Sequence, residues 1–164
     1  PSESREARGL PRGAARREPI EVEKTFSFER GKPAMTVRWK ITNRGRATAR
    51  VRFASEVNLS LLASDADDRF FEVPGVTLAE KKLKSTGESL DVTGIDLVDR
   101  WSGFRIALRF PKAALWRYPV ETVSQSEGGF EATYQGSCLA PVWTLDLEPG
   151  KTVERDVSLS FGDA

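Results

Sequence analysis

Residues 35–42, MTVRWKIT, decide the fold class of this chain, because apolar and polar residues alternate in them without a break. Successive side chains of a β-strand point to opposite faces, so this stretch has one face for a core and one for water. Residues 43–46, NRGR, follow directly and are typical of a turn. The stretch therefore predicts an amphipathic strand that turns back into another.

The same period of two recurs along most of the chain. It predicts further strands over residues 20–28, 50–61, 90–97, 104–110, 143–147 and 153–161. The phase slips at Thr93–Gly94, and glycine inside a strand pattern often marks a β-bulge. Pro149 and Gly150 fit the central pair of a type II turn.

Helical signal is confined to residues 76–84 and 112–117, each long enough for about two turns. Many strands without a β-α-β rhythm predict an all-β fold, an antiparallel two-sheet β-sandwich. Residues 1–19 mix Arg, Glu, Gly, Ala and Pro without an apolar period. We expect them to form a flexible linker, so that the sandwich domain occupies residues 20–164.

The composition removes several classes of function. Lys plus Arg number 25 and Asp plus Glu number 24, and this net charge of +1 is too small for a nucleic-acid surface. No histidine occurs, so a Ser–His–Asp or Cys–His mechanism is impossible within this chain. The single cysteine, Cys138, excludes an internal disulfide and is expected to be a buried, inert thiol. We expect a cytoplasmic protein without a transmembrane helix or signal peptide.

A resemblance to a known family runs through several stretches. The longest is residues 115–137, LWRYPVETVSQSEGGFEATYQGS, supported by residues 56–71, EVNLSLLASDADDRFF. Shorter support comes from Asp99–Arg100–Trp101 and from Pro141–Val142–Trp143 ahead of residues 147–150, LEPG. These stretches resemble the C-terminal β-domain of family 57 glycoside hydrolases, the α-amylase and 4-α-glucanotransferase group.

This resemblance carries expectations about fold and role. It implies a large sandwich similar to the galactose mutarotase-like supersandwich. In the family, the catalytic carboxylates lie on an N-terminal barrel, and nothing in this chain resembles that barrel. The resemblance therefore implies a non-catalytic domain whose partner is the N-terminal catalytic barrel of a parent chain.

Residues 121–131, ETVSQSEGGFE, are expected to form a long loop between strands. Such loops usually serve a function or a fixed contact, since most hairpin loops are shorter. Glu121 and Glu127 could act as an acid and a base on a glycosidic bond. The alternative is that both carboxylates only hold the loop in shape. The resemblance favours this alternative, because it places the catalytic pair on the barrel.

Aromatic rings beside polar side chains suggest a sugar site, since sugars offer apolar C–H faces and hydroxyl groups. Trp101 is expected at an exposed turn near the same end of the sandwich as residues 121–131. Trp116 and Tyr118 are further candidates for sugar contact, with the alternative that Trp116, like Trp39, is a packed core ring. The candidates for carbohydrate binding or domain contact are Trp101, Arg117, Tyr118, Glu121, Gln125 and Glu127.

The acidic stretch of residues 63–69, ASDADDR, is a weak candidate for calcium through Asp65, Asp67 and Asp68. It lacks the glycine and the final glutamate of an EF-hand loop. A solvated loop, or pairing with a nearby arginine, is the alternative reading. No other cofactor is expected.

These observations together predict a non-catalytic C-terminal domain of an α-glucan-acting enzyme. It would brace the catalytic barrel and could contact α-glucan. The alternatives are a free-standing carbohydrate-binding or protein-interaction module, and a mutarotase-like epimerase. The epimerase is disfavoured because mutarotases depend on histidine. Neither nucleic acid nor membrane is an expected partner.

Overall fold

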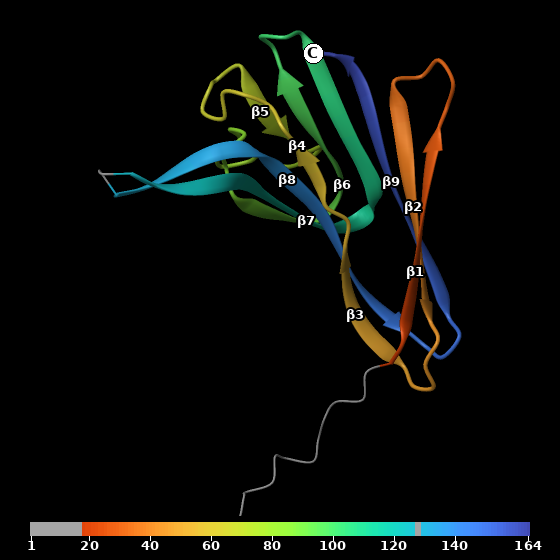
Figure 1. The fold of residues 1–164 in the computed structure, drawn as a ribbon. Coiled ribbons are helices and arrows are strands. Elements are labelled where there is room, and N and C mark those ends of the chain that lie inside the picture. The colour runs from red at the N-terminus through yellow and green to blue at the C-terminus, as the bar shows by residue number, and fades with distance from the viewer. Residues whose placement is uncertain (1–17, 127–128) are drawn as a thin grey trace, which may run out of the picture.

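The computed structural model describes residues 18–126 and 129–164, and the regular elements in these residues are all antiparallel strands (Figure 1). The strands are β1 (Ile20–Phe28), β2 (Ala34–Asn43), β3 (Ala49–Ala54), β4 (Val57–Leu59), β5 (Arg69–Glu72), β6 (Gly87–Asp99), β7 (Phe104–Ser126), β8 (Gly129–Leu147) and β9 (Thr152–Asp163). The described residues contain no helix that could cross a membrane.

Both helices expected from the sequence are wrong. Residues 76–84 form a connection that lies beside β5, where the backbone N–H of Phe71 donates to the carbonyl of Lys81 at 2.7 Å. Residues 112–117 lie inside β7 and pair with β6 and β8. Leu115, Trp116 and Arg117 have partners on both neighbouring strands, and this tertiary pairing outweighs a weak local preference for helix.

The strands form one hydrogen-bonded sheet that folds over into two layers. The first layer has the order β1-β2-β9-β7-β6-β5, and the second adds β8, with β3 and β4 on its far side. The start of β7, Phe104–Arg109, pairs with β9, whereas its later part pairs with β8. The predicted antiparallel sandwich is thus confirmed, with β6 and β7 shared between its layers.

The core lies between these layers and is rich in aromatic rings. Trp39 on β2 meets Phe53 on β3 edge to face at 5.4 Å between ring centroids, and Phe53 stacks on Trp143 of β8 at 6.1 Å. Ile106 and Leu108 of β7 are buried, as the alternation predicts. This packing joins the layers across the sandwich.

Two local predictions are confirmed. The pairing of β6 with β7 shifts register between Ser89 and Val92 and again between Val92 and Gly94, so a bulge lies where the phase slips. A Cβ atom on Gly94 would lie 2.6 Å from the carbonyl oxygen of Leu108, so the close strand approach requires glycine. At the predicted turn, Lys151 N–H donates to Glu148 C=O at 3.0 Å and Gly150 has φ of 76°.

The start of the chain departs from expectation. The structure leaves residues 1–17 of the expected linker undescribed, so that boundary stays a prediction. Glu18 and Pro19 accept hydrogen bonds from the backbone N–H groups of Arg46 and Arg44, at 2.7 and 2.8 Å. The expected apolar face of β1 is largely open to solvent, since Phe28 is 73% exposed.

The long loop expected over residues 121–131 is also wrong, because β7 and β8 continue through it. Their pairing runs from Glu121 opposite Tyr134 to Ser126 opposite Gly129. This two-stranded extension, residues 121–126 and 129–134, projects from the body and is called the arm below (Figure 1). Its base carries a bulge at Gln135, where the register shifts between Val120 and Glu121.

Candidate functional site

Trp101 lies at the turn between β6 and β7 and is 77% exposed, as predicted. The carboxylate of Asp99 shapes this turn by accepting the backbone N–H of Ser102 at 2.8 Å. Strand β7 then runs from Phe104 to Ser126, so the turn and the tip of the arm lie at opposite ends of one strand. The expectation that Trp101 and residues 121–131 share one end of the sandwich is therefore wrong.

Arg117 faces inward and is only 5% exposed. Its guanidinium donates to the carbonyl of Glu80 at 2.8 Å and to the hydroxyl of Ser85 at 3.3 Å. It lies against the backbone of Gly87, where a Cβ atom would be 2.8 Å from it. Burial lowers the pKa of Arg117. This side chain fastens residues 80–87 to β7 and is not presented to a ligand.

The arm has one apolar and one polar face, because directly opposed residues of antiparallel strands point the same way. One face carries Glu121, Val123, Gln125, Phe130, Ala132 and Tyr134, and the other carries Thr122, Ser124, Glu131 and Thr133. Val123 and Phe130 are 67% and 78% exposed. The structure thus places Gln125 beside an exposed phenyl ring, with Glu121 on the same face but four residues closer to the base of the arm.

Two residues qualify the sequence prediction for residues 121–131. Phe130 was not among the predicted site residues, although its position after Gly128–Gly129 could have suggested an exposed ring near a turn. Glu127, one of the predicted site residues, lies outside the described residues. Its pairing with Glu121 as acid and base stays a prediction.

A second cluster lies on the outward face of the second layer, and we call it the aromatic platform: Trp116, Tyr118, Arg52, Glu56 and Glu88. Trp116 and Tyr118 project from the same side of β7. The indole N–H of Trp116 donates to Glu88 at 2.8 Å, and the Arg52 guanidinium lies 5.8 Å from the Trp116 ring centroid. Both rings are half-buried, so Trp116 is a surface ring and not a core ring.

Tyr118 occupies the other end of the aromatic platform. Its hydroxyl donates a long hydrogen bond of 3.4 Å to Glu56. Hydrogen bonding with Cys138, together with burial, raises the pKa of Tyr118 to about 12. The thiol of Cys138 is itself buried, and burial raises its pKa. The expectation of a buried thiol at this position is confirmed.

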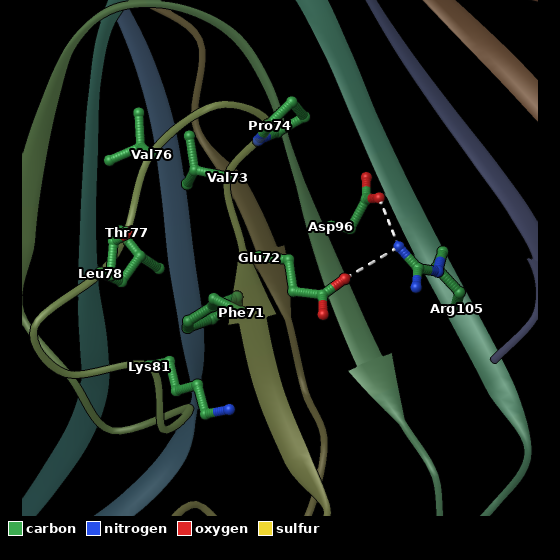
Figure 2. Close-up of a pocket in the computed structure, with 10 residues that line it drawn as sticks. All are labelled: Phe71, Glu72, Val73, Pro74, Val76, Thr77, Leu78, Lys81, Asp96 and Arg105. Carbon is green, nitrogen blue, oxygen red and sulfur yellow. Dashed lines mark hydrogen bonds and ion pairs between the residues drawn. The ribbon is translucent and has the colours of Figure 1, made fainter.

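A hollow of about 620 Å³ lies beside β5 and β6 (Figure 2). Arg105 bridges its two carboxylates, at 3.1 Å from Glu72 and 2.7 Å from Asp96, and Arg109 also binds Asp96. Burial opposes ionisation of Asp96, but the hydrogen bonds from Arg109 and Arg105 prevail and lower its pKa. Asp96 therefore stays ionised near neutral pH and is not suited to act as a general acid.

Carboxylates of the acidic stretch near β5 form ion pairs with lysines. Asp65 contacts Lys82 and Lys84 at 2.9 and 2.8 Å, and Asp67 contacts Lys82 at 3.2 Å. One carboxylate oxygen of Asp68 is buried without a hydrogen bond. Among the residues that the structure describes, no group of three His, Cys, Asp or Glu side chains could hold a metal ion. Calcium binding here stays an untested prediction.

Comparison with known proteins places these features in context. A family model described as "Alpha-amylase/4-alpha-glucanotransferase, C-terminal" matches residues 5–157. Alpha-amylase 1 of Dictyoglomus thermophilum is 34% identical over 139 residues, which cover 81% of this chain. The chain spans only 19% of the length of that relative.

Two solved structures share the fold. The 4-alpha-glucanotransferase of Thermococcus litoralis matches with a TM-score of 0.60 at 18% identity, over 90% of this chain and 19% of its own. A putative aldose 1-epimerase of Escherichia coli matches with a TM-score of 0.68 at 12% identity, over 90% of this chain and 62% of its own. At these identities the likeness establishes the fold alone.

Proposed function

We propose that this chain is a non-catalytic brace for the catalytic part of its parent enzyme. The reason is that the chain belongs to the C-terminal domain family of α-amylases and 4-α-glucanotransferases. Its membership in this family confirms the resemblance drawn from residues 115–137. The amylase relative is about five times as long as the matched region, since that region is 19% of it. A relative of that length has ample chain for a separate catalytic part.

The arm is the observation that carries this proposal. It leaves Val123 and Phe130 exposed on one face of an isolated two-stranded ribbon, which is marginally stable in water on its own. Burying each such side chain against a partner would contribute about 1.5–3 kcal/mol. Glu121 and Gln125, on the same face, would supply hydrogen bonds to that partner.

The chemistry of the described carboxylates supports a role without catalysis. Glu72 and Asp96 are held by arginines, and Asp65 and Asp67 by lysines. Their cationic partners lower the pKa of Asp65 and of Asp96, whereas a glycosidase needs one acid with a raised pKa. The absence of histidine removes the usual alternative base.

A binding experiment between the two parts of the parent enzyme tests the brace. The catalytic part, expressed alone, is titrated with this chain by calorimetry, and Phe130→Ser is expected to weaken binding at least tenfold. Ser124→Ala and Glu131→Gln are matched controls on the polar face of the arm and should bind like the parent chain. Equal binding of all variants would refute docking through the arm. No binding at all would favour a free-standing module.

Contact with α-glucan is a second candidate function. The aromatic platform favours it, because two rings lie beside charged and hydrogen-bonding groups on an open face. The relatives are named as an amylase and a glucanotransferase, which makes α-glucan the ligand to test first. Trp101 is the competing candidate for contact with α-glucan, because its ring is exposed at the β6–β7 turn, away from the arm.

A further inference from the structure

We infer that the aromatic platform is an α-glucan subsite in which Trp116 and Tyr118 form the floor. This inference rests on the proposed contact with α-glucan and is independent of docking through the arm. The sequence already offered Trp116 and Tyr118 as candidate rings, but it placed the sugar beside Trp101 and residues 121–131.

The geometry of β7 places both rings in one row. Trp116 and Tyr118 are two residues apart on the same side of the strand, so their Cα atoms are separated by about 6.6 Å. Their partners on β8 are the small, buried residues Ala140 and Cys138. Side chains this small leave room for the two rings beside them, and both rings remain half-exposed. Flat aromatic faces of this kind pack against the C–H faces of sugar rings.

Polar side chains from three other strands and a loop surround these rings. Glu88 of β6 lies opposite Trp116, and Asn58 of β4 lies opposite Cys138. Arg52 of β3 and Glu56 complete the rim, and all four side chains are exposed. The rim thus offers both acceptors and donors to sugar hydroxyl groups, which provide both in return.

The charge of the rim favours a neutral ligand. It combines one guanidinium with two carboxylates, so phosphate-bearing ligands such as nucleic acids would meet a net negative rim. The ring edges are already hydrogen-bonded, Trp116 to Glu88 and Tyr118 to Glu56. A sugar could therefore pack on the exposed part of the rings without removing these bonds, and at Trp116 it would lie beside the Arg52 guanidinium, which is over that ring.

Tryptophan indole signals give a direct test, because the chain has four tryptophans in distinct settings. The indole N–H groups of Trp39 and Trp143 donate to Ser55 and to the Pro111 and Lys112 carbonyls, and Trp101 is exposed at its turn. Maltoheptaose is added to the ¹⁵N-labelled chain, with cellohexaose as the comparison. We expect the Trp116 signal to move with maltoheptaose, with a Kd on the order of millimolar because so small a site offers few contacts.

Variants then assign the site. Trp116→Ala should weaken binding about tenfold, as loss of one aromatic contact implies. Trp101→Ala is the matched control and should bind like the parent chain. Should Trp116→Ala fail to fold, Arg52→Ala and Glu88→Gln change exposed side chains and should each weaken binding severalfold.

Several results would overturn the inference. Movement of the Trp101 signal without that of Trp116 would return the sugar to the β6–β7 turn. An unmoved Trp116 signal at tens of millimolar sugar would exclude the platform as a glucan subsite. Docking of the arm would be untouched by either result, since its own assay uses no sugar. If the catalytic part perturbs Trp116 and sugar does not, the platform is a protein contact and the inference is wrong.

Discussion

Gln125 lies directly opposite Phe130 in the arm, so an amide and a largely exposed phenyl ring share one face. Beyond the bulge at Gln135, the two strands of the arm pair only with each other in the described residues. Apart from Tyr134 at its base, which packs against the core, the arm therefore owes little of its order to the body of the domain. Substitutions in the arm should therefore change its binding without changing the stability of the body.

Shortening the arm should leave the body intact. Replacing residues 123–132 by a two-residue Asn-Gly turn removes side chains that are exposed at 123–125 and 129–132, so the free energy of unfolding should change by less than about 0.5 kcal/mol. Urea unfolding of the shortened chain measures this. A loss of several kcal/mol would show that the arm packs on the core. The same variant should no longer bind the catalytic part.

Leu108 and Leu90 form a matched pair for the core. Leu108 is buried between the layers, whereas Leu90 is 67% exposed on β6. Leu108→Ala should cost about 2–5 kcal/mol, because it leaves a cavity. Leu90→Ala should cost less than about 0.5 kcal/mol in the same urea experiment. Equal costs would mean that the faces of these strands are assigned wrongly.

Asp96 should make stability depend on acid pH. Its folded pKa lies below the ordinary value, so its contribution is complete above the unfolded pKa and is lost as pH falls through the folded pKa. Asp96→Asn should cost about 2 kcal/mol at pH 7, the scale of a charged hydrogen bond. This cost should shrink below about pH 4, where an unfolded aspartate becomes protonated. Glu72→Gln, at a more exposed carboxylate, is the control with a smaller effect.

Arg117 and Gly87 should be energetically coupled. A Cβ atom on Gly87 would lie 2.8 Å from the guanidinium of Arg117, so Gly87→Ala should lower the free energy of unfolding of this chain. Arg117→Met removes that obstacle, although it also loses the bonds to Glu80 and Ser85. The double-mutant cycle should give a coupling energy of about 0.5–3 kcal/mol. Additive costs would contradict the contact.

Local sequence patterns account for much of the fold. The alternation over residues 104–110 correctly places Ile106 and Leu108 inside, and the phase slip correctly marks the bulge before Gly94. These features depend on neighbouring residues, which a pattern can record. The sharing of β6 and β7 between layers depends on pairings far apart in sequence, and no local pattern encodes it.

The candidate site was harder to predict for a related reason. The arm mixes polar and apolar residues on its exposed strands, so its period is too weak to distinguish it from a loop. The inward turn of Arg117 reflects its bonds to Glu80 and Ser85, which belong to a distant connection. The outward position of Trp116 could be read from its alternation with the buried Leu115, but only once that strand is recognised.

The position of β9 has a consequence for folding during synthesis. Strands β1 and β2 join the rest of the described sheet only through β9, whose Ser160 pairs with Ala34 and whose Leu159 pairs with Leu108. A ribosome makes the β1–β2 hairpin more than a hundred residues before this partner. Until then the hairpin has an unpaired edge and bare apolar side chains, which invite association between nascent chains. This domain is therefore expected to depend on chaperones, or on an already folded upstream part, until its last strand emerges.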